Sequence, residues 1–123
     1  MTVVVFLVAV VAGGVGAALR YAVDVLISAI VGVRFPWGIF VVNVTGSFAL
    51  GIVTGVAAGT DLAFVVGSGL LGGYTTFSTV AVTTALQAEE RRRFVAFAYG
   101  AGTLVATVLA AGFGLALTGR LGG

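Results

Sequence analysis

The amino-acid sequence predicts an all-α membrane protein with four transmembrane helices, the third of which is broken near the middle of the membrane. Of the 123 residues, 60% are hydrophobic and only 8% are charged, whereas soluble domains carry about 25% charged residues. The break is predicted because the uncharged segment from Leu62 to Leu86 is interrupted by paired glycines and a cluster of hydroxyls, Gly72 to Ser78. Inside lipid, broken backbone is tolerated only where it faces protein or water. We therefore expect this segment to line a path for an ion or a polar solute.

The first predicted span runs from about Thr2 to Ile30, and it carries no charge before Arg20 and Asp24. The residues at its start lack the basic stretch of a secretory signal, so we expect the span to be retained. Arg20 is the one basic residue well inside a hydrophobic stretch, which makes it a candidate functional residue. Two simpler roles stay open: Arg20 can extend to the membrane interface, or it can pair with Asp24 one turn later.

The second predicted span runs from Trp37 to Gly59 and follows Pro36, the only proline, which suits the first turn of a helix. Asn43, Ser47 and Thr54 are spaced so that they share one face of this helix. Glycines at intervals of four, here and in the third span, allow helices to approach closely in lipid. Simple packing is the first explanation for these glycines.

The third span is expected from Leu62 to Leu86 and the fourth from Phe94 to Thr118. In the fourth, the polar residues Tyr99, Thr103 and Thr107 repeat every four positions. The connections between spans are short, which makes neighbouring helices antiparallel. Residues 1–123 are therefore expected to form a single four-span domain.

The scarcity of titratable side chains argues against an enzyme. The chain contains neither cysteine nor histidine. It therefore cannot form a thiolate metal site, and it lacks the residue that most often serves as general base or proton shuttle. Only four acids occur, and none of them lies in the middle of a predicted span: Asp24, Asp61, Glu89 and Glu90. The net charge of +2 comes from a few arginines, most of them in loops, and does not indicate a nucleic-acid surface.

Uncharged polar side chains on three predicted helices favour an anion path. Asn, Ser, Thr and Tyr donate hydrogen bonds without a formal charge, so they can replace the water around an anion without trapping it. A single Ser or Thr can instead bond to a carbonyl of its own helix. Asn43 is harder to explain in this way, because its amide needs partners at both ends; a hydrogen bond between helices is the alternative to a transport role. Four short helices enclose little space, so a pore is expected to need a second subunit.

Three segments together resemble the Fluc/CrcB family of fluoride channels, which are small four-span membrane proteins. The resemblance covers essentially the whole chain, and the segments occur in the family's order: Gly13–Tyr21, Trp37–Phe48 and Gly72–Thr79. It implies an antiparallel dimer of dual topology in the cell inner membrane, with two fluoride pores along the subunit interface. The function it implies is passive export of cytoplasmic fluoride.

The resemblance also implies roles for individual residues. A structural Na⁺ would lie at the dimer centre, bound by the main-chain carbonyls of Gly72 and Thr75. Fluoride would pass the edge of the Phe77 ring, where the positive part of the ring quadrupole lies. The pore residues implied by position are Asn43, Ser78, Thr79, Tyr99, Thr103 and Thr107, and the polar patterns add Ser47 and Arg20 as candidates.

One position departs from the family motif, because Val80 stands where a second phenylalanine is usual. The loop charges are also unequal: Arg34, Arg91, Arg92 and Arg93 fall on one side of the predicted spans, and only Arg120 and the α-amino group fall on the other. Such a bias favours a single orientation. Two assemblies therefore stay open, a homodimer and a heterodimer with an oppositely inserted paralogue, in which this chain could be a degenerate partner.

Two other classes of protein account for less of the sequence. A four-span multidrug antiporter would need a carboxylate in the middle of a span, and the first span has none before Asp24. A non-conducting structural subunit would explain the glycines, but it would leave the polar stripes and the broken third span without a role.

Overall fold

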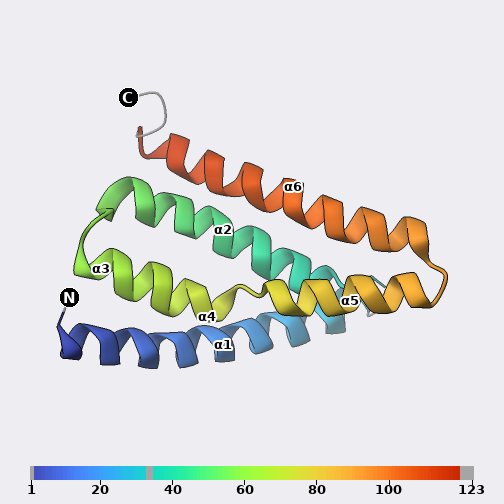
Figure 1. The fold of residues 1–123 in the computed structure, drawn as a ribbon, viewed down its shortest axis with the longest axis horizontal. Coiled ribbons are helices and arrows are strands. Elements are labelled where there is room, and N and C mark those ends of the chain that lie inside the picture. Colours follow the sequence, from blue (N-terminus) through green and yellow to red (C-terminus); the bar gives the residue numbers. More distant parts are fainter. Residues whose placement is uncertain (1, 33–34, 120–123) are drawn as a thin grey trace.

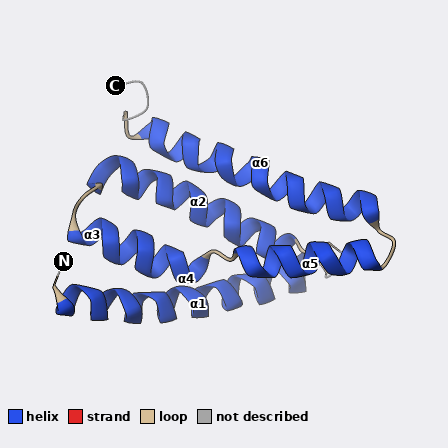
Figure 2. Cartoon of the chain, viewed as in Figure 1, coloured by secondary structure: helices blue, strands red, loops and turns tan. Residues whose placement is uncertain are grey.

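The computed structural model describes residues 2–32 and 35–119, and within them every regular element is a helix (Figures 1 and 2). The first two passes are α1 (Val3–Val31) and α2 (Trp37–Ala57), and the last is α6 (Arg93–Leu117). The third pass is built from four pieces: α3 (Asp61–Ala63), η1 (Phe64–Leu71), α4 (Gly72–Tyr74) and α5 (Phe77–Glu89). All four passes are long and apolar enough to cross a membrane, which confirms the predicted four-span architecture. Arg34, Arg120 and the side chains of Phe77 and Ser78 lie outside the described residues.

The helix boundaries follow from local sequence signals. The Thr2 hydroxyl caps α1 by accepting a hydrogen bond from the Val5 amide at 3.2 Å, and the Thr60 hydroxyl caps α3 through the Ala63 amide at 3.1 Å. Gly59 precedes this second cap with a φ of 83°, a conformation that glycine adopts without strain. The turn between α5 and α6 closes when the Arg92 amide donates to the Gln87 carbonyl at 2.9 Å. Short turns of this kind make consecutive passes antiparallel (Figure 1).

The two halves of the third pass pack against different neighbours. The first half, η1 and α4, lies along α1, whereas α5 lies along α6, and α2 packs against both α1 and α6. Glycines allow the closest approaches: a Cβ on Gly69 would lie 2.7 Å from the Ala9 carbonyl oxygen, and one on Gly16 would lie 2.9 Å from the Tyr74 amide nitrogen. Small residues therefore bring α1 and the third pass into backbone contact, as expected for helices in lipid.

The third pass differs from the sequence prediction in two ways. The glycine-rich segment Phe64–Leu71 is a π-helix, which the sequence analysis did not anticipate. The break lies inside the predicted segment Gly72 to Ser78 but not at its glycines: Gly72 and Gly73 are helical, and the chain becomes extended at Thr75 (φ −79°, ψ 157°) and Thr76 (φ −148°, ψ 117°). The hydroxyl residues that follow the glycines, and not the glycines themselves, form the break.

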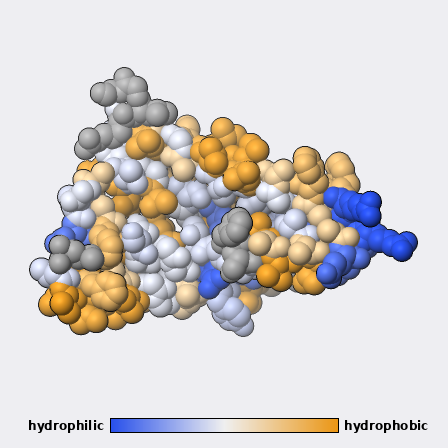
Figure 3. Space-filling model, viewed as in Figure 1, coloured by the Kyte–Doolittle hydropathy of each residue, from blue (hydrophilic) through white to orange (hydrophobic). Residues whose placement is uncertain are grey.

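Large hydrophobic side chains are exposed along the helices, including Val11, Phe94 and Leu109, which are 69%, 82% and 67% exposed. An apolar surface of this extent would drive association in water, whereas in a bilayer it faces lipid. In the space-filling view (Figure 3), the most hydrophilic surface gathers at the end formed by the α5–α6 turn, where Glu89, Glu90 and Arg91–Arg93 lie. This distribution, together with the four apolar passes, identifies a multi-pass membrane protein.

Candidate functional site

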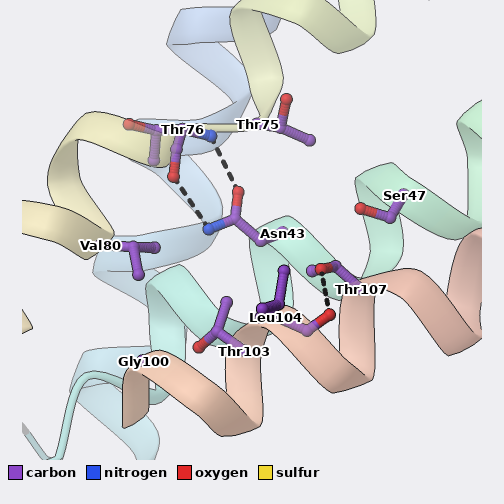
Figure 4. Close-up of a pocket in the computed structure, with 9 residues that line it drawn as sticks. All are labelled: Asn43, Ser47, Thr75, Thr76, Val80, Gly100, Thr103, Leu104 and Thr107. Atoms are coloured by element: carbon purple, nitrogen blue, oxygen red, sulfur yellow. Dashed lines mark hydrogen bonds between the residues drawn. The ribbon is translucent and has the colours of Figure 1, made fainter. Parts of the chain in front are cut away.

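The polar residues of α2, the break and α6 meet around one cavity of about 220 Å³, which we call the α2–α6 cavity (Figure 4). The described residues that line it are Asn43, Ser47, Thr75, Thr76, Val80, Gly100, Thr103, Leu104 and Thr107. Asn43 and Ser47 were predicted on one face of the second span, and Thr103 and Thr107 on one face of the fourth. The packing of α2 against α6 brings the two stripes together. None of these lining residues is charged.

Asn43 is bound at both ends of its amide by the broken segment. Its Nδ2 donates to the Thr76 carbonyl at 3.0 Å, and its Oδ1 accepts from the Thr76 amide at 2.8 Å. The Thr76 amide can only donate, so this pair of bonds fixes which end of the Asn43 side chain carries the oxygen. Asn43 is only 6% exposed. The side chain therefore replaces the acceptor that the Thr76 amide loses when the helix opens, and it adds a donor to the Thr76 carbonyl. One of its two amide hydrogens is left for another partner.

The same break diverts two amides away from the carbonyls of Gly72 and Thr75. In a continuous helix the amide of each residue donates to the carbonyl four positions earlier, so Thr76 would pair with Gly72 and Thr79 with Thr75. Here the Thr76 amide donates to Asn43, and the Thr79 amide donates to the Thr76 hydroxyl at 3.2 Å. Thr76 acts as the N-cap of α5 in this arrangement. The two carbonyls implied for Na⁺ are thus among those that lose their helical partners at the break, together with Gly73 and Tyr74, because α4 ends at Tyr74 and α5 begins at Phe77.

Three other predicted site residues, Thr79, Tyr99 and Arg20, are not among the described residues that line the α2–α6 cavity. Thr79 is half-buried, and its Oγ1 accepts a hydrogen bond from the Thr76 hydroxyl at 3.1 Å. Tyr99 is fully buried beside the cavity residues of α6, with its ring edge-on to Phe35 at 5.5 Å between centroids. Arg20 is half-buried on α1 and forms no ion pair with Asp24, so this simpler role for Arg20 is not observed. The side chains of Phe77 and Ser78 lie outside the described residues.

Thr54 does not join Asn43 and Ser47 at the cavity, although sequence spacing predicted one face for all three. It is exposed and lines a separate hollow near the start of the third pass. Sequence analysis also missed the role of Thr76 and the presence of Gly100 in the wall. The first had a recognisable signal, because a threonine that follows a helix break is a typical N-cap. For Gly100 the sequence signal was weaker, and it consisted only of a position three residues before Thr103 on the polar stripe.

The chemistry of the α2–α6 cavity is that of neutral hydrogen-bond donors in an apolar setting. Hydroxyl and amide groups can replace part of the hydration shell of a small anion. Asp24, the one carboxylate that lies within a pass and not at its end, is half-buried elsewhere, where it accepts from the Ser28 hydroxyl at 3.4 Å. The described residues also hold no group of three or more side chains that could bind a metal ion.

Comparison with known proteins gives consistent matches over nearly the whole chain. The family model described as "CrcB-like protein, Camphor Resistance (CrcB)" matches residues 7–115. A protein of Leifsonia xyli named fluoride-specific ion channel FluC 1 is 41% identical, over 97% of this chain and 90% of that protein. A fluoride-specific ion channel FluC of Novosphingobium aromaticivorans is 40% identical, over 85% of this chain and 88% of that protein. A fluoride-specific ion channel FluC 2 of Mycobacterium tuberculosis is 36% identical, over 98% of this chain and 91% of that protein.

Proposed function

We propose that this chain, which belongs to the CrcB family, is a fluoride-specific ion channel that lets fluoride leave the cytoplasm passively. The relatives that carry this name match it over most of their length. As a member of a channel family, the chain is a transport protein and not an enzyme. The α2–α6 cavity is the observation from the structure that best supports the proposal, because it gathers uncharged donors from separate passes at one place.

The path we propose for fluoride uses the residues at the cavity and the break. Asn43, Ser47 and Thr103 would offer hydrogen bonds in turn, so that the ion loses water without meeting a fixed charge. Thr107 would join them when its hydroxyl turns away from the Leu104 carbonyl, to which it donates at 3.0 Å. Phe77, Ser78, Thr79, Tyr99 and Arg20 remain candidates that the resemblance or the sequence pattern suggests. In the inner membrane, such a path would carry out fluoride that entered the cell as the neutral acid and dissociated inside.

We further propose that the channel works as an antiparallel dimer with a pore on each side of the subunit interface. The single chain supports this because its cavity is small and open at the surface of only four passes. A homodimer and a heterodimer with an oppositely inserted paralogue are the two candidates. Val80 bears on the choice, since it lines the cavity at the position where the family usually has a phenylalanine, and it is 8% exposed. A heterodimer could supply the missing aromatic ring from the partner.

The proposed structural Na⁺ would bind the main-chain carbonyls of Gly72 and Thr75. These residues fit the ion because the break draws away the amides that would bond to both carbonyls, and oxygen ligands suit a hard cation. Unwound backbone at the middle of a broken membrane helix is a common way of holding Na⁺. A cation there would also raise the local positive potential for a passing anion.

The first test is efflux from liposomes that contain the purified chain alone. We expect fast efflux of fluoride and little efflux of chloride, measured with ion-selective electrodes after the membrane potential has been clamped. Fluoride-selective efflux would establish a self-sufficient channel and show that Val80 is tolerated. If the folded chain conducts neither ion alone but does so when produced with an oppositely inserted paralogue, the heterodimer is correct. Chloride efflux equal to fluoride efflux would contradict the proposal.

Replacing Gly72 by leucine tests the proposed centre of the dimer. Gly72 is exposed and has helical φ and ψ, and a Cβ there would lie 3.8 Å from its nearest neighbour, the Gly67 carbonyl oxygen. The single chain therefore accommodates a side chain, and its helix content should not change. At a dimer centre, however, the leucine would separate the two subunits, so we expect loss of the dimer on size-exclusion chromatography and loss of fluoride flux.

The matched control is Gly112→Leu, at a helical glycine of α6 where a Cβ would have no neighbouring atom within 4 Å. This variant should keep the dimer and the flux. A Gly72→Leu protein that remains a stable, active dimer would remove Gly72 from the centre and argue against the Na⁺ site.

A further inference from the structure

Four buried side-chain oxygens on α5 and α6 have no hydrogen-bond partner within the part of the chain that the structure describes. They are Thr84 Oγ1, Gln87 Oε1, Tyr99 Oη and Thr103 Oγ1. Buried polar atoms in native proteins nearly always have a partner, either in the protein or in bound water. In a membrane protein the cost of leaving such a group unpaired is high, and polar residues within the spans commonly mark an ion or proton pathway. Four such oxygens close together indicate that a ligand or solvent molecules pass between the helices and bind them.

The four oxygens belong to one interface that starts at the α2–α6 cavity. Thr103 is part of the cavity wall, and Tyr99 lies one turn away from it on α6. Gly100 connects this stretch to α5: it also lines the cavity, and a Cβ on it would lie 3.4 Å from Thr84 Oγ1. Gln87 follows Thr84 by three residues, on the same side of α5. Because α5 packs along α6, the oxygens form a row that leads away from the cavity.

This row ends at the arginine-rich turn. The backbone carbonyl of Gln87 accepts the Arg92 amide at 2.9 Å, so the residue lies at the base of the turn, and its side chain is only 5% exposed. The turn carries three arginines, Arg91–Arg93, and the acids Glu89 and Glu90 face the same region; the Arg92 guanidinium lies 4.0 Å from the Glu90 carboxylate. The surplus of positive charge raises the local concentration of anions at this end of the molecule.

We propose that Thr84 and Gln87 extend the fluoride path from the α2–α6 cavity, between α5 and α6, to the arginine-rich turn. The proposal rests on the proposed function of the chain as a fluoride channel, and it adds two residues that the sequence analysis did not place in the pore. Threonine and tyrosine hydroxyls rotate, so each can direct its hydrogen at an anion. The Gln87 amide has nearly the same shape when turned over, and then presents its N–H groups where the structure assigns the oxygen. The apolar side chains of Ile39 on α2 and Val80 on α5 pack in one core with Tyr99.

The test combines fluoride flux with thermal stability in Thr84→Val, Gln87→Leu and the double variant. If the unpaired oxygens exist to meet the ion, removing them lowers flux, and it leaves stability unchanged or raises it because no protein partner is lost. We expect a fluoride efflux rate about tenfold lower for the double variant, the scale of one lost hydrogen bond to an ion, with an unchanged or higher melting temperature. Thr84→Ser keeps the hydroxyl and should restore most of the flux.

Thr54→Val is the matched control, since it makes the same substitution at an exposed threonine outside the α2–α6 cavity, and both flux and stability should be unchanged. Wild-type flux in the double variant would overturn the proposal. A fall in melting temperature together with flux would also overturn it, since that pattern belongs to a structural role. Failure of the unmodified protein to conduct fluoride would instead overturn the proposed function itself.

Discussion

Replacing Asn43 by alanine is expected to abolish most fluoride flux and to lower the thermal stability of the protein. Asn43 supplies the donor for the Thr76 carbonyl and the acceptor for the Thr76 amide, at 3.0 and 2.8 Å. Alanine would remove both of these hydrogen bonds and, with them, the observed acceptor for the buried Thr76 amide, at a cost of about 1–3 kcal/mol. Thr76 would then be free to shift, and the geometry of the break and of the cavity wall would change with it.

Asn43→Asp tests the charge at the same position. The carboxylate keeps the shape of the side chain and still accepts from the Thr76 amide, but its second oxygen would face the Thr76 carbonyl, to which the asparagine donates, and two oxygens there repel each other. It also places a negative charge in the wall of the proposed anion path. We therefore expect a reduction in flux of at least about tenfold, the effect of roughly 1.4 kcal/mol at the barrier, measured as the initial rate of efflux from liposomes.

Ser47→Ala is the matched control for stability. Ser47 is one turn from Asn43 on α2 and lines the same cavity, yet its side chain forms no hydrogen bond to the described residues of the break. Its removal should leave the melting temperature unchanged. Undiminished fluoride flux in Asn43→Asp would take Asn43 out of the path, and an unchanged melting temperature in Asn43→Ala would show that the bonds to Thr76 do not hold the break.

The parts of the site that sequence predicted are those set by local periodicity. Residues four apart share a face of a helix, so the pairs Asn43 with Ser47 and Thr103 with Thr107 could be recognised without a structure. Hydropathy located the four passes in the same way, because the length of an apolar segment decides whether it can cross a membrane. The cavity forms where the polar faces of the second and fourth passes meet, because α2 packs against α6.

The parts that sequence did not predict depend on contacts between distant segments. Paired glycines and hydroxyls predicted a break between Gly72 and Ser78, but its exact position is where Asn43, 33 residues from Thr76, offers an alternative partner for the backbone. The π-helix of Phe64–Leu71 has no clear signature in its own residues. It lies against α1, whose backbone is within contact distance of Gly69. The row of unpaired oxygens likewise becomes visible only when α5 and α6 are placed side by side.

Gly16→Ala is expected to destabilise the protein by about 1–3 kcal/mol, the usual effect of inserting a methyl group into a packed site. Gly16 is buried on α1, and a Cβ there would clash with the Leu70 carbonyl oxygen and lie 2.9 Å from the Tyr74 amide nitrogen. Both neighbours are backbone atoms, so neither can move aside by changing a rotamer. The whole of α1 would have to retreat from η1 and α4, the segments that lead into the break.

Gly14→Ala, two residues away on the same helix, separates this packing effect from the general effect of replacing glycine. Gly14 is exposed, and a Cβ on it would have no neighbour within 4 Å. Alanine favours the helical conformation over glycine by about 1 kcal/mol in water, so Gly14→Ala should be neutral or slightly stabilising in thermal unfolding of the detergent-solubilised protein. A lower melting temperature for Gly16→Ala alone would show that contact between α1 and the third pass stabilises the fold. Equal melting temperatures for the two variants would mean that α1 can move away at no cost.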